Sequence, residues 1–209
     1  MTKINYVFLI FMTTMYPRVF EKYDPEKDAA QLETILKQHE KFLFNPGVTV
    51  DAALDYFATQ PRVYLLKEAD RVIGFINCIV IDNTLCGCTL YKQGLINGIA
   101  VNDEYRRQGH GKELLEYGLA LFSQEGVSSA VATVHSDNIA TLSFFKKAGF
   151  EHKETFTEHD VPNELLEKKL SIFNRYFLGN LIHRYRYEIL TTELLALGYI
   201  IMNGKGQKD

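Results

Sequence analysis

The chain has 209 residues, a length that fits one domain with room for a short appendage. Its 46% hydrophobic and 23% charged residues are the proportions of a folded globular protein and exclude a disordered chain. A formal net charge of -3 and a pI near 6.1 argue against binding to a nucleic-acid backbone, so no nucleic-acid partner is expected.

An N-terminal extension is predicted over residues 1–15. Within it, the apolar run 6–12 follows Lys3 as the core of a signal peptide would. The run is too short to cross a bilayer, which takes roughly 20 apolar residues, and no small-residue cleavage site follows it. We therefore expect a cytoplasmic protein without a membrane partner, with Met12 and Met15 as alternative starts.

Three cysteines lie close together at Cys78, Cys86 and Cys88. An odd, bunched set is typical of reduced thiols rather than of a disulfide framework. Cys86 and Cys88 have the spacing of half a metal site, but no second Cys or His pair follows at ligand spacing. We therefore expect ordinary thiols and no metal ion.

The first part of the domain is predicted to run from strand to helix. Residues 18–23 alternate as a strand does, and Asp24 is placed to cap a helix that begins at Pro25 and continues to His39. Thr49 is placed to cap a second, shorter helix, which a proline ends. Two helices are therefore expected before the main strands begin.

The middle of the chain is predicted to be mainly strand. Runs of β-branched residues predict a hairpin of strands 62–67 and 71–81. Residues 82–94 have the composition of an irregular connection, and residues 95–101 that of a further strand. The turn 102–104 then leads into a loop with two glycines.

The later elements alternate between helix and strand. Apolar residues after Gly111 lie on one face of a helix, and residues 129–134 form an almost wholly apolar strand, which favours a buried position. Either Asp137 or Ser136 is expected to cap a helix over residues 138–148.

The loop of residues 106–111 stands between a strand and a helix. In this arrangement, backbone N–H groups and a helix N-terminus hold a phosphate, although the pattern also fits a loop that merely turns. A Walker loop is excluded because Glu113 stands where its Ser or Thr belongs. A dinucleotide fingerprint is excluded because Leu114 stands in place of its third glycine.

Arg106, Gly109 and Gly111 match the main signature of the GNAT superfamily of acyl-CoA-dependent N-acyltransferases. The chain resembles that family in further segments, which follow one another in family order at family spacing: 98–101, 102–105, 138–140 and 145–150. The set as a whole is much more specific than a glycine loop alone.

The resemblance implies a three-layer α/β (α+β) fold in residues 16–170, with a mixed sheet of about seven strands and helices on both faces. The last two strands are expected at 151–159 and 164–170, although apolar residues of the second also keep helical spacing. Strands 95–101 and 129–134 are expected to splay apart and open a cleft for the cofactor.

The cofactor that the resemblance implies is acetyl-CoA (coenzyme A). Its pantetheine arm is expected to pair with the splayed strand, and its diphosphate to lie on the N–H groups of the glycine loop. The helix that follows is expected to line the thiol end. The implied cofactor-binding residues are Ile99, Ala100, Val101, Arg106, Arg107, Gln108, Gly109, His110, Gly111, Lys112, Asn138 and Phe145.

The implied activity is transfer of an acetyl group from acetyl-CoA to a primary amine of a small molecule or a protein, by direct attack in a ternary complex. This transfer needs a neutral amine, a stabilised oxyanion and a proton for the thiolate. Phe145 stands where many members have the tyrosine that supplies the proton. A GNAT-like module that binds acyl-CoA with little or no turnover is therefore an alternative, as is a structural interaction protein.

No catalytic residue is assigned from the sequence. Asp82, Asp103 and Glu104 flank the strand where a base is expected, but acidic residues in loops are more often only solvated. His110 is predicted to be a surface side chain of the loop, and His135 to point either into the cleft or toward a helix cap.

Residues 171–209 exceed the family core. Their apolar positions keep helical spacing, which indicates helices packed on the core or across a homodimer, with a substrate lid as the less favoured interpretation. The acceptor pocket is expected from the segments 24–59 and 82–94 and from the tail after residue 170, with Tyr91 as a lining aromatic.

Overall fold

Twelve elements follow one another in residues 17–85 and 88–170, the part of the chain that the computed structural model describes. Their bounds are close to those expected, apart from a longer central hairpin. In chain order they are β1 (Arg18–Lys22), α1 (Pro25–Leu43), α2 (Val50–Thr59), β2 (Val63–Glu68), β3 (Arg71–Leu85), β4 (Cys88–Val101), the 3-10 turn η1 (Asp103–Tyr105), α3 (His110–Gln124), β5 (Ser129–His135), α4 (Ile139–Lys147), β6 (Glu151–Glu158) and β7 (Val161–Lys169).

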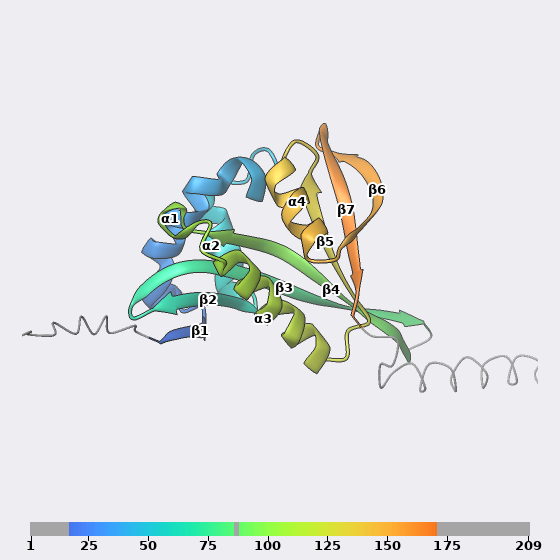
Figure 1. Cartoon of the computed structure of the whole chain (residues 1–209), viewed down its shortest axis with the longest axis horizontal. Helices are drawn as coiled ribbons and strands as arrows, with labels where there is room; N and C mark the ends of the chain where they lie inside the picture. The colour runs from blue at the N-terminus through green and yellow to red at the C-terminus, as the bar shows by residue number, and fades with distance from the viewer. Residues whose placement is uncertain (1–16, 86–87, 171–209) are drawn as a thin grey trace, which may run out of the picture.

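The strands form one sheet of seven in the order β1-β2-β3-β4-β5-β7-β6 (Figure 1). All neighbouring strands are antiparallel except β4 and β5, which run parallel. The two strands expected at the end of the domain are confirmed as β6 and β7, and β7 begins earlier than expected, at Val161. The sheet is mixed, as the resemblance implied.

Helices cover both faces of the sheet, because successive strand residues point to opposite faces. Leu65 of β2 packs in a core with α1 and α2, whereas the next residue, Leu66, packs in a second core with α3. Gly118 lets α3 lie close to the sheet, since an added Cβ would come within 2.5 Å of Ile76 Cδ1. The expected three-layer fold is therefore confirmed.

Side-chain caps begin three of the helices. Asp24 and Thr49 accept hydrogen bonds from backbone N–H groups in the first turns of α1 and α2, as predicted. The cap expected at Asp137 or Ser136 is wrong, because Asn138 accepts the N–H of Thr141 at 3.2 Å and begins α4. Those two residues instead bond to side chains of α1 and β7.

The irregular connection expected over residues 82–94 is also wrong. β3 and β4 continue through it as a hairpin, in which Asp82 pairs with Lys92 and Asn83 with Tyr91. An ion pair of 3.7 Å joins the Asp82 and Lys92 side chains. This end of the hairpin extends beyond the rest of the sheet (Figure 1), so it carries polar residues and its composition is that of a loop.

β4 and β5 separate near the middle of β4. Their pairing ends at Ile96 and Ala132. The next residue of β4, Asn97, has no partner in β3, and this extra residue makes a β-bulge, which bends a strand. Beyond the bulge β4 pairs with β3 alone, while β5 continues beside β7 to His135. The expected splay is confirmed.

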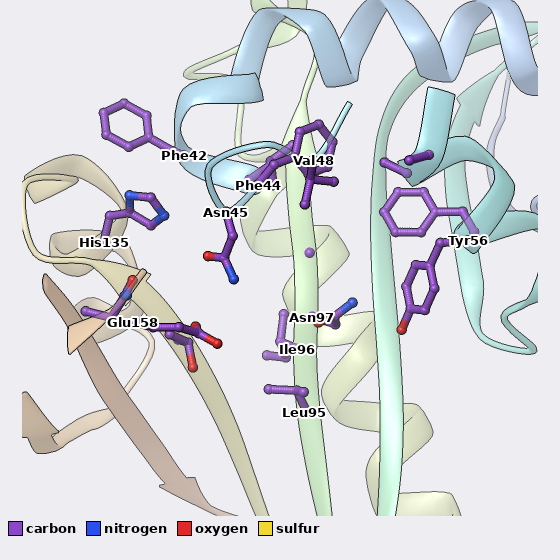
Figure 2. Close-up of a pocket in the computed structure, with 17 residues that line it drawn as sticks. Phe42, Phe44, Asn45, Val48, Tyr56, Leu95, Ile96, Asn97, His135 and Glu158 are labelled. Carbon is purple, nitrogen blue, oxygen red and sulfur yellow. The ribbon is translucent and has the colours of Figure 1, made fainter. Parts of the chain in front are cut away.

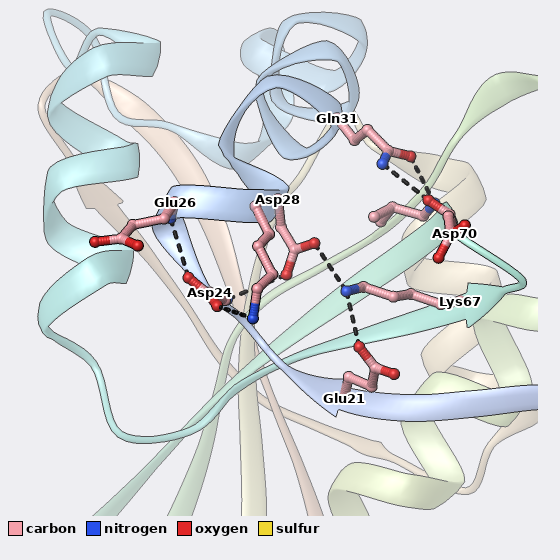
Figure 3. A network of polar contacts seen from close by, with 9 residues as sticks. Glu21, Asp24, Glu26, Asp28, Gln31, Lys67 and Asp70 are labelled. Carbon is pink, nitrogen blue, oxygen red and sulfur yellow. Dashed lines mark hydrogen bonds and ion pairs between the residues drawn. The ribbon is translucent and has the colours of Figure 1, made fainter.

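An ion network around the buried side chains of Lys67 and Asp28 fixes α1 against the first two strands (Figure 3). Lys67 Nζ of β2 lies 2.8 Å from Asp28 Oδ1 of α1 and 2.9 Å from Glu21 Oε2 of β1. Burial acts against the Lys67 charge, but the two hydrogen bonds outweigh it and raise the pKa of Lys67. The network bears on the candidate site because the other end of α1 reaches the loop of residues 106–111 and the pocket described below.

Cys78 is a buried thiol, as predicted for the cysteines. It lies in the core beneath α3, and burial raises its pKa to about 12. A thiol held neutral in this way packs as a small hydrophobic side chain. The side chains of Cys86 and Cys88 lie outside the described residues.

The predicted extensions, residues 1–15 and 171–209, lie outside the described residues as well. So do the helical character expected for the second and its packing on the core or across a homodimer. Within the described ranges, no helix is both long enough and apolar enough to cross a membrane.

Candidate active site

The loop between β4 and α3 presents a row of backbone N–H groups. Within the described residues, no hydrogen bond uses the N–H groups of residues 107–111. Arg107 (φ +62°) and Gly109 (φ +91°) have left-handed backbones, and such alternation turns successive N–H groups toward one side. Glycine suits position 109, whereas Arg107 adopts this conformation at a cost of about 1 to 2 kcal/mol.

This row leads into the N-terminus of α3, whose cap residue Gly109 has no side chain to occupy the first N–H groups. Exposed Arg106, Arg107 and Lys112 add positive charge around it. The N–H of Lys112 already donates to the Gly109 carbonyl at 3.0 Å, so the row ends one residue earlier than expected. Unpaired N–H groups at a helix N-terminus fit a diphosphate such as that of coenzyme A.

Arg106 and the end of β4 are held by α1. His39 Nε2 donates to the Val101 carbonyl at 2.9 Å, and His39 Nδ1 accepts from Arg106 Nη2 at 2.7 Å. Both bonds fit one neutral tautomer of His39, and burial together with the Arg106 charge lowers its pKa. An ion pair of 2.8 Å between Arg106 and Asp103 completes the contact. His39 gave no signal in the sequence.

His110 differs from its prediction as a surface residue, because its side chain is 6% exposed. Its Nδ1 lies 3.1 Å from Arg18 Nη1 and 3.6 Å from Glu113 Oε2, and its ring meets Tyr105 edge-on. His110 therefore connects the first turn of α3 to β1. Gln108, by contrast, is exposed, and its side chain donates to the Glu104 carbonyl at 3.4 Å.

The edge of β4 beyond the bulge lies open toward β5. Ile99, Ala100 and Val101 pair with β3 on one side and have no partner in β5 on the other. The Val101 carbonyl accepts a hydrogen bond from His39. The remaining backbone groups on this edge are where the pantetheine arm was expected to pair.

The helix expected to line the thiol end is α4, and its two phenylalanines differ: one is in the core and the other lies beside the glycine loop. Phe145 is 2% exposed and packs edge-on against Phe144 and Phe150. Phe144, which the sequence interpretation did not single out, is half-buried, and its Cε2 lies 3.7 Å from the position of a Cβ added at Gly111. Asn138 uses its carbonyl oxygen to cap α4.

A pocket of about 460 Å³, called here the acceptor pocket, opens where β4 and β5 separate (Figure 2). Residues 95–98 of β4, including the bulge, form its floor. Residues 42–45 and 48, from α1 and the connection to α2, form one wall. Tyr56 and Phe57 of α2 form a second wall. Thr133 and His135 of β5, Glu158 of β6 and Asn163 of β7 complete the lining.

The acceptor pocket contains one histidine and one carboxylate among its described lining residues, His135 and Glu158. The carboxylates considered as bases from the sequence lie elsewhere. Asp82 is on the projecting hairpin, and Asp103 and Glu104 lie at the turn before the glycine loop. Glu158 was missed because it lies in an exposed strand of alternating residues, which gives no sign of the pocket.

His135 points into the cleft, so one of its two predicted positions is confirmed (Figure 2). Its ring stands edge-on to Phe42 with centroids 6.1 Å apart, and it makes no hydrogen bond to another described residue. Directly opposite in the β5–β7 ladder is Asn163, 2% exposed, whose Nδ2 donates to the Val161 carbonyl at 3.0 Å. Tyr91, expected to line the pocket, is 45% exposed on the hairpin instead.

A second pocket of about 480 Å³ adjoins the first. Four residues line both pockets: Phe44, Asn45, Val48 and His135. The rest of the second pocket carries several charged side chains, namely Glu40, Lys41, Asp137 and Asp160. The two pockets together form a groove between the α1–α2 connection and the ends of β5, β6 and β7.

A model of the acetyltransferase (GNAT) family matches residues 16–150, well over half of the chain. N-alpha-acetyltransferase 30 of Schizosaccharomyces pombe (strain 972 / ATCC 24843) is 31% identical over 87 residues, which is 42% of this chain. The match spans about half of that relative, 55% of its length.

Solved structures share the fold. The NatC complex bound to Gag peptide and CoA is similar with a TM-score of 0.58 at 17% identity, over 74% of this chain and 99% of that chain. Arabidopsis thaliana Naa50 in complex with the bisubstrate analogue CoA-Ac-MVNAL is similar with a TM-score of 0.57 at 20% identity, over 73% and 98%. At these identities the likeness concerns the fold alone.

Proposed function

Because the chain belongs to the acetyltransferase (GNAT) family, we propose that it transfers the acetyl group of acetyl-CoA to the α-amino group at the N-terminus of a polypeptide. The observation that carries this proposal is the position of the acceptor pocket. It opens on the bulged part of β4 and continues into a second pocket, so that the groove suits an extended chain.

The relatives support a polypeptide acceptor. The similar chain from Schizosaccharomyces pombe is named an N-alpha-acetyltransferase, and two structures of the same fold hold a peptide or a peptide joined to CoA. A small amine would leave most of a groove of this size unfilled. We therefore favour a protein N-terminus over a polyamine or another compact amine.

Acetyl-CoA would be held by groups of the cofactor side. The N–H groups of residues 107–111 and the charges of Arg106 and Arg107 suit its diphosphate, and the open edge of β4 suits its pantetheine arm. The half-buried ring of Phe144 lies beside the loop at Gly111. Once bound there, acetyl-CoA supplies an activated acetyl thioester.

The chain's own residues place the acceptor. The bulge at Asn97 turns β4 away from β5, so an amine in the acceptor pocket can reach the open strand edge. Phe44, Val48 and Tyr56 offer apolar walls against which the side chain of the acceptor can pack. Near neutral pH the amine must also lose a proton before it attacks.

An acetyl-transfer assay tests the proposal. The full chain is incubated with acetyl-CoA and peptides with a free N-terminus, and CoA release and peptide mass are measured. We expect acetylation at the α-amino group. The matched control is the same peptide with a blocked N-terminus and an internal lysine, which should stay unmodified.

Three outcomes would contradict the proposal. Acetylation of the internal lysine would assign a different amine, and acetylation of a polyamine alone would assign a small acceptor. Acetyl-CoA binding without turnover on any of these amines would favour the binding module.

A further inference from the structure

We propose that His135 accepts the proton of the acceptor's ammonium group and releases it to water through the second pocket. This inference rests on the proposed function and assigns the base that the sequence left open. It starts from the place of His135 at the boundary of the two pockets, on the last residue of β5.

Only four described residues line both pockets, and His135 is the one among them that can carry a proton. The others are a phenylalanine, an asparagine and a valine. A base at this boundary can face the amine on one side and bulk water on the other. A proton taken in the acceptor pocket therefore has a way out that does not pass the cofactor.

The surroundings leave both nitrogens of the ring available. The His135 ring makes no hydrogen bond to another described residue, and it is held by an edge-on contact to Phe42. Asn163 lies directly opposite in the strand ladder, on the same face of the sheet. The backbone of His135 is fixed as well, because its carbonyl accepts the N–H of Asn138 at 2.9 Å.

Five charged side chains line the two pockets that His135 joins. Glu40 and Lys41 face it from α1, Asp137 from the β5–α4 turn, and Glu158 and Asp160 from β6 and the turn after it. Four of these five groups are carboxylates, and the ammonium of Lys41 is 3.3 Å from Asp137.

The chemistry of the proposed acceptor fits a histidine base. The reference pKa of an α-amine is about 7.7 to 8.0, close to the range in which histidines titrate, whereas that of a lysine side chain is about 10.4. Histidine takes one proton from the ammonium, and the neutral amine forms the C–N bond as the C–S bond breaks. The second N–H proton goes to the thiolate, so the products are the amide and the thiol.

The test compares His135→Gln and His135→Phe with the wild type, using a free N-terminal peptide between pH 6 and 9. The control is His152→Gln, since His152 is an exposed histidine of β6 that bonds to Thr155 and Glu164 outside the pocket. We expect both His135 variants to lower kcat by about 10²-fold at pH 7 with little change in KM. The deficit should shrink above pH 8, where the amine is neutral without help.

A second measurement does not depend on turnover. In protein with ¹⁵N-labelled histidines, NMR should show the His135 ring becoming protonated when the peptide is added at pH 7.5. Melting curves check the folding of each variant, and His135→Phe keeps the ring contact with Phe42.

The outcomes separate this inference from the proposed function. If the wild type acetylates the peptide and folded His135 variants stay within twofold of it at every pH, His135 is not the base. A deficit that is the same at all pH values, with no change in the ring signal, would also overturn the inference. If the wild type acetylates no N-terminal peptide, the proposed function fails and this inference with it.

Discussion

The proposed cofactor side, at the loop of residues 106–111, and the proposed acceptor side, at the acceptor pocket, are built in different ways. The cofactor loop takes its N–H groups from consecutive residues, 107–111, and needs few particular side chains. The acceptor pocket takes side chains from α1, α2 and four strands. A site made of local backbone leaves a readable sequence motif, whereas one assembled from distant side chains does not, because their juxtaposition depends on the whole fold.

The largest expected effect is on the free energy of unfolding, and it tests whether Phe145 belongs to the core rather than to the cofactor side. Phe145→Ala should lower the free energy of unfolding by about 3 to 5 kcal/mol, because it removes a ring that is 2% exposed. Denaturant unfolding measures this loss.

The matched variant is the neighbouring ring, Phe144→Ala. Compared with Phe145→Ala, this substitution should lower the free energy of unfolding less and the affinity for acetyl-CoA more, because Phe144 is half-buried beside Gly111. Equal effects of the two variants on both quantities would show that the division between core and site is wrong.

Gly109→Val should weaken acetyl-CoA binding by about 10²-fold, or roughly 2.7 kcal/mol. A β-branched residue disfavours φ +91° and would turn the N–H groups away from the diphosphate. The control is Gly126→Val, at the other end of α3, which also has a positive φ of +73°.

The two glycine variants separate strain from binding. Both should melt at lower temperature, but acetyl-CoA should raise the melting temperature of Gly126→Val and the wild type only. A normal rise for Gly109→Val would place the diphosphate elsewhere.

On the acceptor side, Tyr56→Ala should raise the KM for the peptide about tenfold, or roughly 1.4 kcal/mol, by removing a wall of the acceptor pocket. Acetyl-CoA affinity should not change. Tyr91→Ala is the control, because this exposed tyrosine lies on the hairpin outside the pocket. If both substitutions raise KM equally, the acceptor does not lie where the pocket is.

The smallest effect concerns the contact between α1 and the cofactor loop. The pKa of His39 is lowered in the folded state, so the unfolded chain binds more protons near pH 6.5 and below. The stabilising contribution of His39 is therefore fully present above the pKa that it has in the unfolded chain. It is lost as the pH falls from that value through the lower pKa of the folded state.

His39→Gln keeps a donor for the Val101 carbonyl and removes the titrating group. Its melting temperature should fall less between pH 7.5 and pH 5 than that of the wild type, by an amount on the order of a few degrees. Identical pH profiles for the two proteins would show that His39 does not contribute.

Where sequence prediction failed, the failures follow from the same contrast between local and distant structure. The hairpin at residues 82–94 has the composition of a loop, because β3 and β4 pair only with each other before Gln93 and extend beyond the rest of the sheet there. His110 looked like a surface residue of a glycine loop, yet Arg18 and Glu113 surround it. In both cases the structure of the segment depends on what it contacts. The hairpin residues pair with the facing strand, and His110 contacts Arg18, which is distant in the sequence.

By itself the sequence determined the order of strands and helices, two helix caps and the position of the glycine loop between β4 and α3. These depend on residues within a few positions of one another, such as Asp24 or Thr49 and the N–H groups that follow each of them. The mixed sheet of about seven strands and the splay between β4 and β5 came from the family resemblance, whereas the order of strands in the sheet came from the structure.

Only the tertiary structure decided the acceptor pocket and the neighbours of His39 and His135. The bulge at Asn97 opens the pocket, and His135 enters it because β5 continues beside β7 after leaving β4. Strand pairing and helix packing bring residues from 42 to 163 within one pocket. The lining residues do not recur at a regular spacing along the chain, so no sequence pattern indicates that they come together.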